Sequence, residues 1–236
     1  MSRLFTLRLL FTAYFGIFFN AQFVTQATAQ TSQFENITPR IETKQFQLFE
    51  DIEKHQVRIL DRATQQTLRV LRLQNKQGKF SQLSTILHHE RRQSFILVLP
   101  DIAELWELSY DPKAEPVYQG WVHDYQMGEG IADTQLFAPR KTLLSTALDC
   151  FILDPQRPYV AGADQHGKFQ IINLDIRRQI VEYQFAQPMY PCLSKIENTG
   201  ATSVLHLKMK SAAADNTDTT SSVILIDMKT GKQLMR

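Results

Sequence analysis

Several functional signals are missing from this chain of 236 residues. It holds only two cysteines, and no Cys-x-x-Cys-His motif is present, so no c-type haem is attached to it. The sequence shows no glycine-rich phosphate loop, zinc-ligand spacing or serine triad. Positive charge is not in excess either, because 26 basic residues face 24 acidic ones. Binding to nucleic acid needs concentrated basic charge, so nucleic acid is not an expected partner.

The N-terminus has the composition of a secretory signal peptide. Two arginines precede an apolar run centred on residues 9–19, and a small-residue cleavage site follows at Ala27-Thr28-Ala29. The alternative is a membrane-spanning anchor, but polar residues from Asn20 onward interrupt the run before it reaches the roughly 20 residues of a span. Cleavage after residue 29 leaves 207 residues and no stable membrane anchor. We therefore expect a periplasmic or secreted chain with one domain or one repeat array.

A repeat of short apolar runs follows a polar segment at residues 30–46, which is either a linker or a terminal strand in need of a partner. From Phe46 onward no stretch has a convincing helical period. Four apolar runs end on an aspartate, with spacings of 50, 64 and 52 positions between the aspartates: Val57–Asp61, Leu105–Asp111, Ile171–Asp175 and Val223–Asp227. A period near 50 in an all-β chain predicts propeller blades of four strands each.

The remaining strands of the predicted blades recur around these runs. Outer strands are expected at residues 67–73, 179–185 and 233–235. Pairs of inner strands are expected at 83–87 with 94–99, 149–153 with 159–163, and 192–196 with 203–209. The first blade lacks its inner strand in this assignment, and an insertion from His123 to Arg140 explains the long spacing of 64. The predicted fold is an all-β, partial β-propeller of about four blades over residues 47–236.

The stretch from Ile102 to Ile131 has the most unusual composition in the chain. A strand is expected at Leu105–Tyr110 and a second extended run at Val117–Val122. The next eight residues, His123 to Gly130, contain an imidazole, a thioether, two carboxylates and two glycines. His123 and Met127 are therefore candidate axial ligands of a cofactor, while the alternative for His123 is a solvated or locally bonded loop histidine.

This stretch resembles the cytochrome d1 haem domain, the β-propeller of cytochrome cd1 nitrite reductase and of related haem d1 biosynthesis proteins. The likeness is most specific at Trp106–Ile131 and covers roughly Gln47 to the C-terminus. Supporting matches are Arg92–Ile96, Leu148-Asp149 and Val223–Lys229. The resemblance implies an eight-bladed propeller with haem d1 in its central opening, of which this chain supplies about half. The family's proximal iron-ligating histidine would lie before Gln47, where this sequence has the linker and the signal peptide.

The resemblance also implies two distal histidines that donate hydrogen bonds to bound nitrite and deliver protons. His206 in His206-Leu207-Lys208 matches one of them. Cys192 in Pro191-Cys192-Leu193 stands in place of the other, and a thiol cannot act as an imidazolium donor, although a thiolate can ligate iron. Two roles stay open for His206: contact with a tetrapyrrole, or a polar residue lining an inner channel. Enzyme activity is uncertain and nitrite reductase-like at most.

Cys150 and Cys192 are both placed on innermost strands of successive predicted blades. Adjacent inner strands approach each other, so these residues form either a disulfide between blades or two separate small core side chains. The neighbouring histidines His88 and His89 are expected in a turn and do not form a joint metal site.

Two functions follow as expectations. One is a periplasmic cytochrome d1-like propeller domain, related to haem d1 binding in denitrification or in haem d1 biosynthesis, with impaired or lost catalysis. It would depend on an external electron donor for any redox activity. The alternative is a non-catalytic propeller segment that acts as an interaction or assembly module. An open array of blades exposes a sheet face at each end, so a second propeller half or a homodimer is the expected partner.

Overall fold

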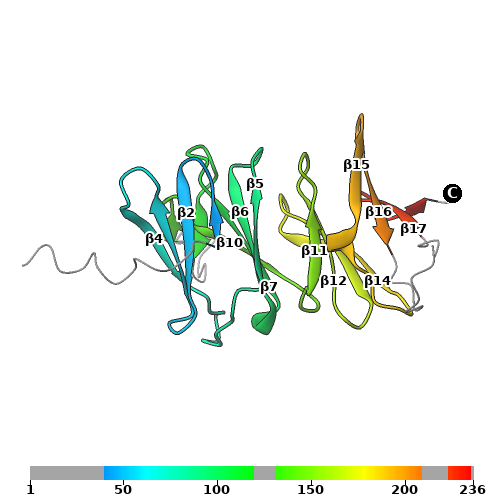
Figure 1. The fold of residues 1–236 in the computed structure, drawn as a ribbon, viewed down its shortest axis with the longest axis horizontal. Coiled ribbons are helices and arrows are strands. Elements are labelled where there is room, and N and C mark those ends of the chain that lie inside the picture. The colour runs from blue at the N-terminus through cyan, green and yellow to red at the C-terminus, as the bar shows by residue number, and fades with distance from the viewer. Residues whose placement is uncertain (1–39, 120–130, 209–222, 235–236) are drawn as a thin grey trace, which may run out of the picture. The chain divides into compact units, whose positions relative to one another are not determined.

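The computed structural model describes residues 40–119, 131–208 and 223–234 (Figure 1). The predicted signal peptide and the candidate ligands His123 and Met127 lie outside the described residues. Four antiparallel sheets of four strands each account for most of the described chain. No helix in these three ranges is long and apolar enough to cross a membrane.

The first sheet contains β1 (Ile41–Glu42), β2 (Phe46–Asp51), β3 (Gln56–Asp61) and β4 (Thr67–Arg72), adjacent in that order. β1 is a short edge strand that pairs with β2. The prediction that the first blade lacks its inner strand is therefore wrong. Ile41 and Glu42 form that strand within the segment expected to be either a linker or a terminal strand in need of a partner. The strand is too short to produce an alternating pattern in the sequence.

The second sheet contains β5 (Thr85–His89), β6 (Ser94–Leu99), β7 (Glu104–Ser109) and β10 (Pro139–Leu143). A 3-10 turn, η1 (Pro100–Ile102), connects β6 to β7. The order is β10-β7-β6-β5, so the chain again runs from one edge of the sheet to the other. The predicted turn at His88 and His89 is wrong, because these are the last two residues of β5.

An insertion separates β7 from β10. β8 (Val117–Gln119) and β9 (Ile131–Asp133) pair with each other as a separate two-stranded sheet. The predicted extended run from Val117 begins as expected, and its end lies outside the described residues. The predicted insertion runs too far, because Arg140 pairs with Glu107 of β7 inside the second sheet.

The third sheet contains β11 (Cys150–Leu153), β12 (Tyr159–Ala163), β13 (Lys168–Asn173) and β14 (Arg178–Gln184), adjacent in that order. β12 has the bounds that the sequence predicts. A continuous run of small and apolar residues forms this strand, and the two prolines of the preceding turn stay outside the ladder.

The fourth sheet contains β15 (Lys195–Thr199), β16 (Thr202–Lys208), β17 (Val223–Asp227) and β18 (Gln233–Leu234). Before it lies a short 3-10 turn, η2 (Pro191–Leu193). Cys192 is therefore in η2, and the prediction that it lies on an inner strand is wrong. A proline at the start of this turn is compatible with a helical turn, because its missing N–H is not needed there.

The sheets stack face to face in chain order, like successive blades of a propeller. One apolar cluster joins the first and second sheets, another the second and third, and a third one the third and fourth. β6 and β7 of the second sheet are buried throughout, because other sheets cover both of their faces. β16 of the fourth sheet alternates between buried and accessible residues, as a strand covered on one face does. The fold is therefore a partial β-propeller of four blades.

The turn between the third and fourth strands repeats from blade to blade. In the first blade Oδ1 of Asp61 accepts the amide N–H of Thr64 at 2.7 Å, and in the fourth Oδ1 of Asp227 accepts that of Thr230 at 2.7 Å. In the third blade this role belongs to Asn173, whose Oδ1 accepts the N–H of Asp175 at 2.9 Å. The residue of the third blade that corresponds to Asp61 and Asp227 is thus Asn173. It lies two positions before Asp175, which the repeat predicts for this role.

Candidate functional site

His206, the residue matched to a distal histidine, points away from the core between the third and fourth sheets. Its neighbours Leu205 and Leu207 are fully buried in that core. Strand alternation turns His206 to the opposite face of the fourth sheet, where its side chain is 34% exposed. Its Nε2 lies 3.1 Å from Oε2 of Glu197 on β15. The described residues therefore place an accessible imidazole on the outer face of the last sheet.

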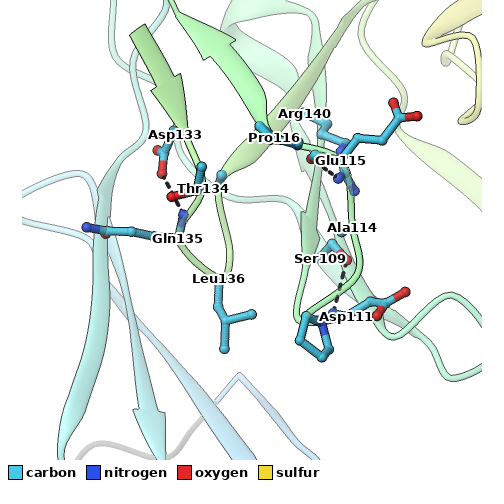
Figure 2. Close-up of a pocket in the computed structure, with 12 residues that line it drawn as sticks. Ser109, Asp111, Ala114, Glu115, Pro116, Asp133, Thr134, Gln135, Leu136 and Arg140 are labelled. Carbon is cyan, nitrogen blue, oxygen red and sulfur yellow. Dashed lines mark hydrogen bonds between the residues drawn. The ribbon is translucent and has the colours of Figure 1, made fainter.

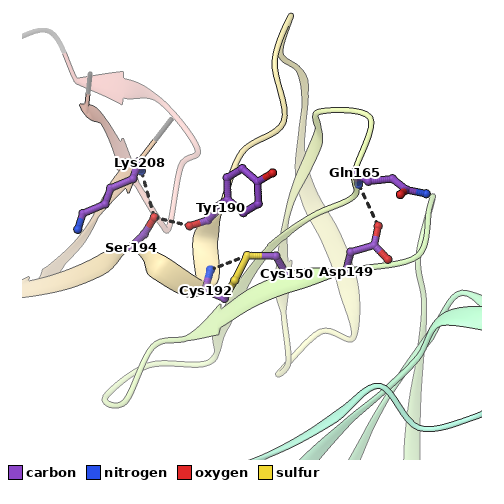
Figure 3. Close-up of a disulfide and its surroundings, with 7 residues drawn as sticks. All are labelled: Asp149, Cys150, Gln165, Tyr190, Cys192, Ser194 and Lys208. Atoms are coloured by element: carbon purple, nitrogen blue, oxygen red, sulfur yellow. Dashed lines mark hydrogen bonds between the residues drawn. A yellow bond between two sulfur atoms is a disulfide. The ribbon is translucent and has the colours of Figure 1, made fainter. Parts of the chain in front are cut away.

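Cys192, which stands in place of the other histidine, is bonded to Cys150 (Figure 3). The disulfide has an S–S distance of 2.03 Å and joins β11 of the third blade to the turn that leads into the fourth. The N–H of Cys192 also donates to Sγ of Cys150 at 3.0 Å. Of the two alternatives that the sequence left open for these cysteines, the structure has the disulfide between neighbouring blades. A sulfur in a disulfide is not a thiolate, so Cys192 in this state offers no ligand to iron.

The segment around Cys192 is fixed by further hydrogen bonds. Oγ of Ser194 donates to the carbonyl of Tyr190 at 2.9 Å and accepts the N–H of Lys208 at 3.1 Å (Figure 3). These contacts hold η2 against the end of β16. Cys192 and His206 consequently lie on neighbouring segments, but the first is tied to the third blade and the second is paired with Glu197.

A haem iron needs an axial donor atom that is free to bind it. In the part of the chain that the structure describes, no group of three or more His, Cys, Asp or Glu residues could hold a metal ion. Of the residues assigned to haem chemistry, only His206 is described with an accessible donor, whereas His123 and Met127 are outside the described ranges. Among the residues that the sequence assigns to haem chemistry, His206 is therefore the described one with an accessible imidazole, and its Nε2 lies beside Glu197.

A small hollow is lined by residues from both ends of the insertion in the second blade, 109–116 and 133–140 (Figure 2). Its volume is about 30 Å³, enough for ordered water but not for a ligand. Its wall is held by local bonds: Oγ of Ser109 accepts the N–H of Asp111 at 3.2 Å, and Arg140 donates to the carbonyl of Glu115 at 2.6 Å. We therefore do not assign a ligand site to this hollow.

A much larger cleft shares part of this wall and extends between the second and third sheets. Its volume is about 520 Å³, within the range of small-molecule sites. The turns β5–β6, β11–β12 and β13–β14 all contribute to it, together with the segment after β7. Charged residues predominate among the lining side chains, which include Arg91, Arg92, Glu107, Asp111, Glu115, Arg140, Arg157, Asp175 and Arg177.

Arg92 connects the second and third sheets, which form the two sides of this cleft. Its Nε donates to Oε1 of Glu107 at 2.8 Å in the second sheet, and its Nη1 donates to Oδ1 of Asp175 at 2.6 Å in the third. Burial acts to lower the pKa of Arg92, but the hydrogen bonds and charges of Glu107 and Asp175 outweigh it and raise that pKa above its ordinary value. The sequence marks Arg92 only as part of the resemblance at Arg92–Ile96, because its partners are 15 and 83 positions away.

A buried polar network lies under the same cleft. His89 is 1% exposed, and its Nε2 is 3.3 Å from the backbone carbonyl of Arg157. Oδ1 of the fully buried Asp154 accepts the N–H groups of Gln156 and Arg157 and the side-chain amide of Asn198. Burial is the main cause that holds the pKa of His89 below its ordinary value. This network couples the second, third and fourth blades, and His89 acts in it as a neutral packing residue.

Comparison with known proteins supports the architecture. No protein-family model matches the chain, and no curated protein matches it in sequence. Among solved structures it is similar to the dihydro-haem d1 dehydrogenase NirN in complex with DHE, with a TM-score of 0.58 and 19% identity over 81% of this chain. It is also similar to hydrazine synthase of Kuenenia stuttgartiensis, with a TM-score of 0.48 and 12% identity over 81% of this chain. A third similar structure is apo AztD of Citrobacter koseri, with a TM-score of 0.46 and 12% identity over 82% of this chain.

The likeness to NirN concerns the fold alone. The chain spans 35% of the length of NirN, 45% of hydrazine synthase and 44% of AztD. With four stacked sheets and this likeness to NirN, the described chain is a segment of β-propeller.

Proposed function

We propose that this chain is an exported, cytochrome d1-like propeller module that assembles with a second copy of itself and has no nitrite reductase activity of its own. The observation that carries the proposal is that the first and fourth sheets each present a partly apolar face that no other described sheet covers. Burial differs accordingly between outer and inner sheets: β16 of the fourth sheet alternates between buried and accessible residues, whereas β6 of the second sheet is buried throughout.

On the fourth sheet, the strand register places four apolar side chains on the uncovered face. Val204 and Leu225 are half-buried, whereas Val223 and Leu234 are 38% and 40% exposed. Leu225 pairs with both His206 and Leu234 across the strands, so these side chains share one face. The four apolar side chains share this face with polar ones, among them His206 and Glu197.

The first sheet offers a similar surface. Phe49 and Leu60 are half-buried on its uncovered face, and Val70 is 47% exposed beside them. A contact between the first sheet of one copy and the fourth sheet of another would repeat the packing that already joins successive blades. Because this contact uses two different surfaces, two copies related by a two-fold axis make it twice and close a ring.

Lack of catalysis is supported by the state of the two distal positions. Cys192 is in a disulfide, and His206 lies beside the carboxylate of Glu197 on the same uncovered face. Two free imidazoles over one face of a haem are the arrangement that the resemblance implies for nitrite reduction. The described residues do not supply that pair.

The proposal is tested by placing a charge on each uncovered face. We expect Val70→Lys or Leu225→Lys to weaken self-association of residues 30–236 by about a hundredfold, because an unpaired charge is buried in the interface. Light scattering across a concentration series measures the effect. Leu143→Lys is the matched control, since Leu143 is 74% exposed on β10 of the second sheet. Unchanged association in both face variants would refute this assembly.

Haem d1 binding is a second candidate, favoured by the likeness to NirN, whose structure is described as a complex with DHE. His206 would be the residue in contact with the tetrapyrrole. The test is a visible absorption titration of the mature chain with haem d1, with His206→Ala as the variant. A Soret shift that is lost in His206→Ala supports this function, whereas no shift, or a shift unchanged in the variant, removes His206 from a haem site.

A further inference from the structure

The cleft between the second and third sheets has a charge distribution that favours an anionic ligand. Five arginines and four carboxylates line it, which leaves a net charge of +1. Arg92 is bonded to both Glu107 and Asp175, so those three groups form one closed cluster with a single negative charge in excess. The other four arginines face the two remaining carboxylates, Asp111 and Glu115, which leaves a net charge of +2 outside that cluster.

Two of these four arginines donate their side-chain hydrogen bonds to uncharged oxygens. Arg157 donates from Nη1 to Oγ of Ser203 at 2.9 Å and from Nη2 to the carbonyl of Gly200 at 2.6 Å. Arg140 donates to the carbonyl of Glu115 at 2.6 Å. A carbonyl or hydroxyl oxygen satisfies a donor without cancelling the guanidinium charge, so both residues contribute a fixed positive potential at the cleft.

The remaining two arginines, Arg91 and Arg177, come from different blades on the two sides of the cleft. Arg91 is in the β5–β6 turn of the second blade, and Arg177 is in the β13–β14 turn of the third. Both are exposed, and neither makes a hydrogen bond or ion pair with another described residue. A guanidinium has five donors in a planar fork that matches the oxygens of carboxylate and phosphate groups.

We propose that this cleft binds a small oxyanion ligand, carrying phosphate or several carboxylate groups, between Arg91 and Arg177. The volume of about 520 Å³ accommodates a small molecule, and Arg140 and Arg157 supply additional positive charge. Such a ligand bridges two blades and stabilises their contact. This site is independent of the assembly proposed above, because its residues lie between the second and third sheets, away from the uncovered faces.

Arg177 allows a variant that removes the guanidinium and preserves the fold. Its backbone has a φ of 51°, in the left-handed region that favours glycine. The corresponding turn of the fourth blade has Gly231 at this position, with a φ of 73°, four residues after the capping Asp227 as Arg177 is four after Asn173. Arg177→Gly therefore suits the local backbone.

The test measures binding of inorganic phosphate and, separately, of citrate to the mature chain by isothermal titration calorimetry. We expect at least one of the two anions to bind, and the comparison distinguishes phosphate from carboxylate ligands. Arg91→Gln and Arg177→Gly should each weaken binding about tenfold, the effect of losing a charge-assisted hydrogen bond. Arg178→Gln is the control, because this exposed neighbour on β14 does not line the cleft.

Two results would overturn the proposal. One is the absence of binding by both anions in a correctly folded chain. The other is equal weakening by Arg178→Gln, which would show attraction by the general surface charge and not by this cleft. Self-association is read separately from mass, so failure of this site and failure of the assembly are distinguishable.

Discussion

His89 links the protonation state of one buried side chain to folding. Burial lowers its pKa from the ordinary value of 6.5, and the charge of Arg92 acts in the same direction. The hydrogen bond to the Arg157 carbonyl and the charges of Glu107 and Asp154 act to raise the pKa but do not reverse the shift. The unfolded chain therefore binds a proton more readily than the folded one just below pH 6.5. It follows that the stabilisation is complete above pH 6.5 and is lost as the pH falls through the folded pKa.

We expect the free energy of unfolding to increase from pH 5 to pH 7 in the wild type, with a smaller slope in His89→Gln. Denaturant titrations at a series of pH values measure that slope. The slope should not vanish, because burial also lowers the pKa of His88, whose Nε2 is 2.8 Å from Oη of Tyr110. An unchanged slope in His89→Gln would show that this histidine is not a source of the pH dependence.

Gly231 combines a backbone requirement with a close contact. Its φ is 73°, and a Cβ built there would lie 2.0 Å from Cγ2 of Val181 in the neighbouring blade. We expect Gly231→Ala to lower the free energy of unfolding by about 2 kcal/mol or more, from left-handed strain and overpacking together. Gly78→Ala is the matched control, with a φ of 81° and no atom within 4 Å, and should cost about 1 kcal/mol. Equal losses would show that the contact with Val181 contributes nothing.

Contacts between single residues that are far apart in the chain cannot be predicted from this sequence. Arg92 meets Asp175 across 83 positions, and His89 meets Arg157 across 68. Both contacts exist only because the second and third blades stack in a particular register. The sequence pattern predicts that blades follow one another, but it does not determine which turn residues face each other.

At the level of strands, the prediction succeeds where apolar runs are bounded by turns. Residues 94–99 and 159–163 are strands with the expected bounds, because strong hydrophobic content and adjacent turn residues determine both ends. β10 (Pro139–Leu143) was missed as a blade strand, since it follows an insertion and has the polar sequence PRKTL. Only its pairing with β7 reveals its role.

The disulfide connects two blades that otherwise meet through side-chain packing. Cys150 and Cys192 are separated by 42 positions, so their bond closes a long loop in the unfolded chain. We expect the double variant Cys150→Ala with Cys192→Ala to lose about 2–4 kcal/mol of unfolding free energy. Wild-type protein in reductant should show a loss of similar size, measured by the same denaturant titration. Equal stability of the oxidised and reduced protein would contradict a stabilising link between the third and fourth blades.

At the scale of the whole molecule, the covered and uncovered faces explain the proposed assembly. The inner sheets bury both faces, as the continuous burial of β6 and β12 shows. The first and fourth sheets bury one face each and leave Val70 and Leu225 accessible in part on the other. The sequence predicts this arrangement from its repeat, and it also predicts a partner. Nothing in the sequence pattern specifies whether that partner is a second copy or a different chain.

The most direct test of the self-assembly is the mass of the mature chain in solution, measured by sedimentation equilibrium on residues 30–236. The account predicts a mass twice that of one 207-residue chain at micromolar concentration, with dissociation promoted by Leu225→Lys. A folded monomer that keeps the mass of a single chain as the concentration rises would contradict it.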